Sequence, residues 1–169
     1  MYRIMLFLFA ATMAFVMSVA TGYASSPDRE TLLERFKLSR IDGPSASADG
    51  HVTKKGTVLV LEADAIPAKE LRFVQANTKS PRFHVADYAR VAVDREGQFT
   101  VGPGDMVLPR GTRLVILDVK VDADQVRLLT HTLELVRLPD GKAVYGCTEF
   151  VFDPSTRIDR WLPGASATS

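Results

Sequence analysis

The chain has 169 residues, a formal net charge of +1 and one cysteine, and 46% of its residues are hydrophobic. This composition is ordinary for one globular domain. A single cysteine excludes an internal disulfide and a zinc site made of several thiolates. The 21 basic and 20 acidic residues lack the cationic excess that nucleic-acid binding requires, so we expect no nucleic-acid partner.

Residues 1–24 have the layout of a secretory signal peptide. Arg3 supplies the positive charge, an apolar run extends from Ile4 to Ala20, and the small residues Gly22 and Ala24 precede the expected cleavage site. We therefore expect cleavage after Ala24, export to the periplasm or the exterior, and no stable membrane insertion afterwards. The alternative is an uncleaved anchor, because about 18 apolar residues can just span a bilayer.

A short helix is expected at the start of the exported chain, within residues 25–50. Ser26 can cap the free amides, and Pro27 suits the first helical position. An apolar stripe at helical spacing follows: Leu32, Leu33 and Phe36. The pattern predicts a packing helix over about residues 27–38. The small and turn-forming residues of 41–50 indicate a flexible linker after it.

Residues 51–153 have a pattern that is typical of β-structure. The run Gly56–Leu61 is short, apolar and rich in β-branched residues, which predicts a strand buried on both faces. Pro67 is expected to break the stretch that follows, and extended pieces are expected at residues 71–75 and 81–85. Turn-forming residues recur at residues 94–97 and 102–105.

The strongest strand pattern begins at Arg113. Apolar and polar residues alternate up to Val121, a tight turn follows, and residues 125–135 return. The apolar parity changes near Leu128 and Leu129, which indicates a bulge there or two strands rather than one.

A hairpin turn at Pro139–Lys142 precedes the last expected strand, residues 143–152. Residues 154–169 are expected to form a short C-terminal tail. Many short strands with close turns, and no alternation of strands with helices, predict a mainly β fold. The expected architecture is a small antiparallel barrel or sandwich, preceded by one short helix.

Four stretches share a distinctive pattern: Gly56–Leu61, Gln98–Gly102, Asp118–Val121 and Phe150–Phe152. In these stretches the chain resembles a family of uncharacterised exported bacterial proteins. The resemblance covers residues 30–153 and implies a signal peptide, a short helix and a compact SH3-like β-barrel. It implies no activity, so it gives no residue a role.

The titratable residues form no catalytic or metal-binding motif. Cys147 lies in an expected strand, and a lone cysteine is most often a small buried hydrophobe. No two of the three histidines, His51, His84 and His131, lie at the spacing of metal ligands on a helix. We therefore expect no catalytic residue, no metal and no cofactor.

A binding surface is predicted in the irregular segment 68–90, where cations and aromatic residues occur together. Small barrels often bind their partners through such segments. The predicted binding residues are Arg72, Phe73, Arg82, Phe83, Tyr88 and Arg90. The expected partner is a protein or a glycan of the cell envelope, and the sequence indicates no oligomeric state.

Two functions from different classes follow. The preferred one is a non-catalytic exported binding module. The alternative is a hydrolase or a thiol-dependent enzyme in which Cys147 acts with His131 or His84. A folding or assembly accessory is a third option. Convergence of the thiol with the two histidines in a pocket would favour the enzyme.

Overall fold

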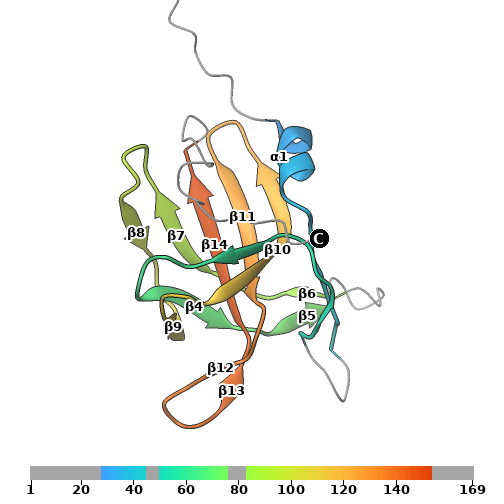
Figure 1. The fold of residues 1–169 in the computed structure, drawn as a ribbon, viewed down its shortest axis with the longest axis vertical. Helices are drawn as coiled ribbons and strands as arrows, with labels where there is room; N and C mark the ends of the chain where they lie inside the picture. The colour runs from blue at the N-terminus through green and yellow to red at the C-terminus, as the bar shows by residue number, and fades with distance from the viewer. Residues whose placement is uncertain (1–27, 45–49, 76–82, 154–169) are drawn as a thin grey trace, which may run out of the picture.

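The computed structural model describes residues 28–44, 50–75 and 83–153, so the predicted signal peptide and C-terminal tail lie outside the described residues. The fold is mainly β with one short helix (Figure 1), as predicted. The elements are α1 (Arg29–Arg35), β1 (Arg40–Ile41), β2 (Val52–Lys54), β3 (Val58–Val60), β4 (Ile66–Glu70), β5 (Phe73–Gln75), β6 (Phe83–Val85), β7 (Ala89–Val93), β8 (Phe99–Val101), β9 (Met106–Leu108), β10 (Arg113–Val121), β11 (Val126–Thr132), β12 (Val136–Arg137), β13 (Ala143–Val144) and β14 (Gly146–Phe152).

Eight of the described strands form one curled sheet. Its order is β3-β10-β11-β14-β4-β9, and β7 pairs with β14 and with β8. The pairing is antiparallel throughout this sheet, except that β7 runs parallel to β14. Figure 1 shows β7, β14, β11 and β10 side by side, with α1 beside β10 and the β12–β13 hairpin at the opposite end. The result is the predicted small barrel-like β fold.

The main hydrophobic core lies on the inner face of this sheet. One row of inward side chains crosses four strands: Val119 on β10, Leu128 on β11, Phe150 on β14 and Val91 on β7. Burial of a side chain of this size stabilises the folded state by about 1.5–3 kcal/mol. Leu32 and Phe36 bring the N-terminal helix onto the same core.

The helix is shorter than predicted and begins at a different cap. Asp28 is the N-cap, and its carboxylate accepts a hydrogen bond of 2.7 Å from the Thr31 amide. The predicted cap, Ser26, lies outside the described residues. The helix ends at Arg35 because Phe36 takes an extended conformation that places its ring, 1% exposed, in the core.

Both described ends of the segment 41–50, which the sequence predicts to be a flexible linker, are hydrogen-bonded in the structure. β1 pairs with β2, and the Asp42 amide donates to the His51 carbonyl over 2.9 Å. The Gly50 amide closes the loop by donating to the Asp42 carbonyl. The described ends of the segment thus belong to the β1–β2 pairing, and residues 45–49 lie outside the described residues.

Two strand predictions in the first half of the sheet also need correction. The run Gly56–Leu61 forms β3, an edge strand in which Leu59 is buried but Val60 is 47% exposed. Pro67 does not break the chain, because it lies inside β4 opposite Val107 of β9. Proline is tolerated where its missing N–H would form no ladder hydrogen bond.

The bulge lies in β10 and not in β11. Ile116 pairs with Thr130 and Asp118 pairs with Leu129, so Leu117 is the extra residue. β11 is continuous, and both of its faces are buried. The apolar residues of β11 change from one face to the other because both faces are buried, and not because the backbone is irregular.

The last hairpin forms as predicted, although the final strand is divided. Gly141 has a φ of +87°, and the Leu138 amide donates to the Lys142 carbonyl over 2.7 Å. The predicted strand 143–152 becomes β13 and β14, with Tyr145 between them.

Candidate functional site

The outer face of the sheet, opposite the main core, carries a second buried layer. Val115, His131 and Cys147 form a row across β10, β11 and β14, because each pairs with the next. None of these three residues exposes any surface, and Leu129 in the adjacent row is only 8% exposed. Segments outside the main sheet must therefore cover this face.

Tyr145 and the chain around Gly50 form part of that cover. The Tyr145 ring centre lies 4.7 Å from that of the His131 imidazole. Gly50 has a φ of +82°, and a Cβ there would lie 3.3 Å from Nε2 of His131 and would overlap the Leu71 side chain. Only glycine fits this position, for its backbone conformation as well as for space.

Cys147 and His131 are cross-strand neighbours in this layer, as the enzyme alternative requires. Burial raises the pKa of the Cys147 thiol to about 12. Burial also lowers the pKa of His131 to about 4, against an opposing effect of the Thr132 backbone. Both ring nitrogens of His131 lack a hydrogen-bond partner. The pair is therefore a neutral thiol beside a neutral imidazole, and not the thiolate–imidazolium pair of a cysteine nucleophile.

The third candidate catalytic residue, His84, lies away from this pair. It is exposed on β6, where it pairs with Val74 of β5. Two of the three candidate residues thus meet in the structure, and they meet in a closed layer.

An aromatic groove of about 480 Å³ opens on the same outer face. Leu117 and Leu129 of the main sheet contribute to it from below, and the β5–β6 hairpin and Tyr88 contribute to its wall. Asp118 and Lys120 of β10 supply charged groups. The lining residues are Ile41, Gly43, Phe73, Phe83, His84, Val85, Tyr88, Leu117, Asp118, Lys120 and Leu129.

The polar groups of the aromatic groove differ in their availability. Burial raises the pKa of the Tyr88 phenol, with smaller contributions from Cys147 and Asp118, so this hydroxyl stays protonated. Asp118 accepts hydrogen bonds from the Val119 amide and from Arg29. Lys120 has no ion-pair partner among the described residues, which leaves its ammonium group free for a ligand.

Three of the six predicted binding residues, Phe73, Phe83 and Tyr88, line this groove together. Arg82 lies outside the described residues. Arg72 and Arg90 do not line it. Hydrogen bonds from the Glu70 amide and from Lys69 lower the pKa of the Asp105 carboxyl, and the charge of Arg72 makes a smaller contribution, so this arginine lies toward Asp105.

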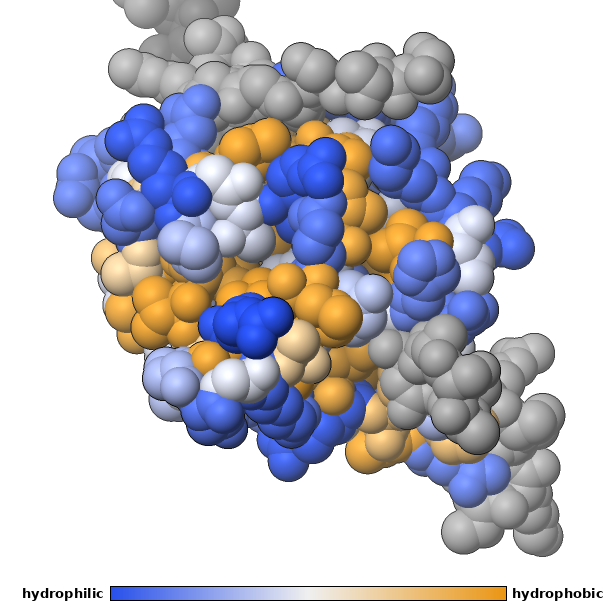
Figure 2. Space-filling model, turned by 60° about the horizontal axis from the view of Figure 1, so that its bottom comes forward, coloured by the Kyte–Doolittle hydropathy of each residue, from blue (hydrophilic) through white to orange (hydrophobic). Residues whose placement is uncertain are grey.

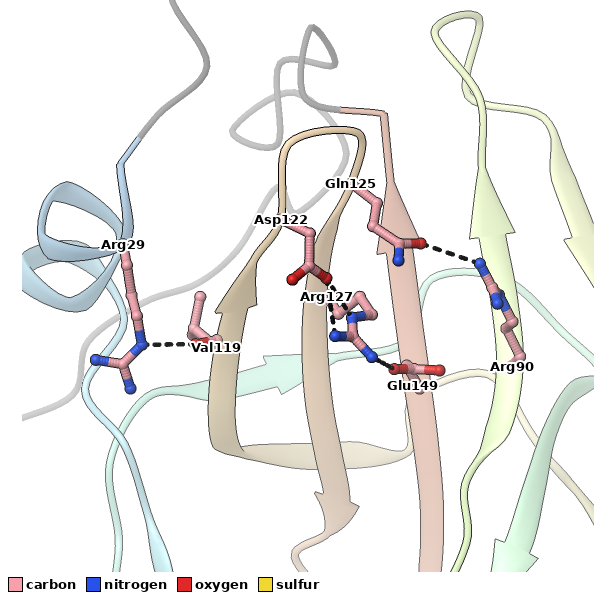
Figure 3. Close-up of polar contacts among 7 residues, drawn as sticks. All are labelled: Arg29, Arg90, Val119, Asp122, Gln125, Arg127 and Glu149. Atoms are coloured by element: carbon pink, nitrogen blue, oxygen red, sulfur yellow. Dashed lines mark hydrogen bonds and ion pairs between the residues drawn. The ribbon is translucent and has the colours of Figure 1, made fainter.

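Arg90 belongs to a set of polar contacts at the α1 end of the outer face (Figure 3). Its guanidinium donates to the Gln125 side chain over 3.2 Å. Arg127 bridges Asp122, at 2.8 Å, and Glu149, at 3.5 Å. These cations already have partners, whereas Lys120 has no ion-pair partner within the part of the chain that the structure describes. The sequence reasoning missed Asp118 and Lys120 as groove residues, although their alternation on one strand was the signal that could have found them.

A second and larger groove, the end groove, has a volume of about 1110 Å³. It lies between β9, the start of β10 and the β12–β13 hairpin, and the sequence reasoning missed it. Figure 2 brings this end of the molecule forward and shows apolar side chains gathered around charged ones. The lining residues are Asp105, Met106, Val107, Pro109, Gly111, Thr112, Arg113, Glu134, Leu135, Val136, Arg137, Leu138, Pro139 and Asp140.

The described residues contain no helix with the length and hydropathy of a membrane span. They also contain no group of three or more His, Cys, Asp or Glu side chains that could hold a metal ion. The fold thus defines a mainly β protein with a curled sheet and one helix. Comparisons with protein-family models, with curated proteins and with solved structures found no match, so the resemblance to an exported family stays a prediction from the sequence.

Proposed function

We propose that this protein is an exported, non-catalytic binding module of the cell envelope that holds a glycan in the aromatic groove. One observation carries the proposal: Phe73, Phe83 and Tyr88 come from separate positions in the chain and line a single groove beside the charged groups of β10. Phe83 is 47% exposed, so its ring offers apolar contact to a ligand rather than to the core.

The composition of the groove favours a glycan over a protein partner. A sugar ring presents C–H groups on its face and hydroxyl groups at its edge, which suits aromatic rings beside polar side chains. The Lys120 ammonium and the Tyr88 hydroxyl can donate to sugar oxygens. A stable protein interface involves about 20–30 residues on each partner, whereas eleven residues line this groove.

Two parts of the proposal depend on the sequence. Export depends on the signal-peptide features of residues 1–24. The SH3-like class depends on the resemblance described above, and the curled, largely antiparallel sheet supports it. In such small barrels, a groove beside a surface hairpin is a common place for a ligand.

The experiment compares two phenylalanines of equal exposure. Phe83 is 47% exposed at the groove, and Phe99 is 48% exposed on β8. Purified protein is titrated with polysaccharide isolated from the cell envelope. We expect Phe83→Ala to weaken binding by about tenfold or more and Phe99→Ala to leave it unchanged. Equal binding by both variants would refute the groove, and retention of envelope protein instead of polysaccharide would refute the glycan.

The enzyme alternative has one observation in its favour, which is the pairing of His131 with Cys147. Both residues are fully buried, and the shifted pKa values keep the thiol protonated and the imidazole neutral. A thiol nucleophile acts as a thiolate, so this function requires the cover of the outer face to open. Hydrolysis of ester substrates that Cys147→Ser abolishes would establish the alternative.

A further inference from the structure

The end groove lies at the open seam of the curled sheet. One side is β9, the last strand in the sheet order, which pairs only with β4 among the described strands. The other side includes Thr112 and Arg113 at the start of β10, near the opposite end of that order. No described strand fills the space between them, so the barrel is not closed by hydrogen bonds at this point.

The outer edge of β9 carries backbone groups that can pair with one more strand. Val107 pairs with Pro67, which has no N–H to donate. Their pair therefore occupies the non-hydrogen-bonded position of the antiparallel ladder, where the amide and carbonyl of Val107 point away from β4. Unpaired backbone groups at a sheet edge are the feature that recognises an extended peptide.

Apolar side chains line the end groove together with five charged residues: Asp105, Arg113, Glu134, Arg137 and Asp140. Asp105 forms an ion pair with Lys69, and Asp140 accepts a hydrogen bond from the Lys142 amide. Val107 and Leu135 are 60% and 54% exposed, so both present apolar surface to a ligand in the groove. Arg113 forms an ion pair with Glu134, so these two charges satisfy each other. Arg137 lines the groove and has no ion-pair partner among the described residues.

We infer that the end groove binds an extended peptide segment of a partner protein, which adds to β9 as a further strand and places an acidic side chain on Arg137. The hydrogen bonds to Val107 supply affinity that does not depend on sequence. The apolar lining and Arg137 select alternate apolar side chains and a carboxylate. This site is separate from the aromatic groove, so the two can hold a peptide and a glycan independently.

The test begins with random peptides displayed on phage and selected on the full-length protein. We expect the selected peptides to share alternating apolar residues and an Asp or Glu. The affinities of the synthesised peptides are then measured by isothermal titration calorimetry. Val107→Pro removes the outward amide without touching the β4 ladder and should weaken binding more than tenfold, whereas Val107→Ala keeps that amide and should lose less.

The acidic position has its own test by charge exchange. Arg137→Glu should weaken binding by about five- to tenfold, and replacement of the peptide acid by Lys should restore it. Phe83→Ala should leave peptide binding unchanged, which separates this inference from the proposed glycan function. Failure to select any peptide, or equal affinity for Val107→Pro and wild type, would overturn the inference. Affinity that survives Arg137→Glu would overturn the acidic preference.

Discussion

Acidification should destabilise this protein through His131. In the folded state burial holds the pKa of this imidazole at about 4, whereas its ordinary value is 6.5. As the pH falls through 6.5 the unfolded chain takes up the proton and the folded protein does not. The free energy of unfolding therefore decreases from about pH 6.5 to about pH 4, and it is independent of this group above that window.

The size of the effect follows from the two pKa values. The difference between 6.5 and about 4 corresponds to about 3 kcal/mol once the pH is below both values. At about pH 4.5 most of this loss, about 2–3 kcal/mol, should already be present. His131→Leu removes it, because leucine has a similar volume and no proton to bind. Near neutral pH the substitution should be neutral or stabilising, since it removes two buried nitrogens that have no hydrogen-bond partner.

The assay is urea unfolding of wild type and His131→Leu at about pH 7.5 and about pH 4.5. Carboxylates titrate in both proteins, so the difference between the two pH dependences isolates His131. The matched control is His51→Leu, because His51 is exposed and lies outside the buried layer. The loss of unfolding free energy between the two pH values should be larger in wild type than in His131→Leu. If the two losses differ by less than about 1 kcal/mol, the argument that burial alone governs the pKa of this histidine is refuted.

Three further outcomes are expected. Gly56→Ala should lower the free energy of unfolding by about 1–3 kcal/mol, because the new Cβ would overlap the Lys37 carbonyl oxygen. The control is Gly43→Ala, whose Cβ would lie in open space and should change the free energy of unfolding by less than about 0.5 kcal/mol. Leu128→Ala should cost about 2–5 kcal/mol, since Leu128 is fully buried in the main core, and equilibrium unfolding by urea measures this loss; a cost below about 1 kcal/mol would contradict that placement. The Cys147 thiol should not react with a disulfide reagent in the native protein at neutral pH and should react fully in urea; rapid native labelling would show that the outer cover opens readily.

The sequence predicts a bulge in β11, but the structure has it in β10, because alternation of apolar residues cannot show which strand is irregular when both faces of a strand are buried. In β11 the inward residue Leu128 and the outward residues Leu129 and His131 are all buried. A period of two identifies a strand only when one face is exposed to water. Here Tyr145 and the chain at Gly50 cover the outer face. Gly50 lies far from β11 in the sequence, and the β12–β13 hairpin separates Tyr145 from β11. The irregular residue was Leu117 of β10 instead.

Among the candidate binding residues, the aromatic ones and the arginines have different places in the structure. The composition of segment 68–90 made Phe73, Phe83 and Tyr88 candidates, and the structure places these three residues along one groove. The arginines were not separable by that reasoning, since Arg90 contacts Gln125 across the sheet and Arg72 lies toward Asp105. The end groove was not predicted at all, because β9 and the β12–β13 hairpin meet only after the sheet curls.

The sequence by itself determined the mainly β class, the short helix α1 and the hairpin turns. These features depend on residues that are close in the chain, such as Gly141 with its positive φ. The tertiary structure decided which strand faces are buried, which charges already have partners and where the two grooves open. Such features depend on long-range pairing, and a pairing such as that of β4 with β9 leaves no trace in local pattern.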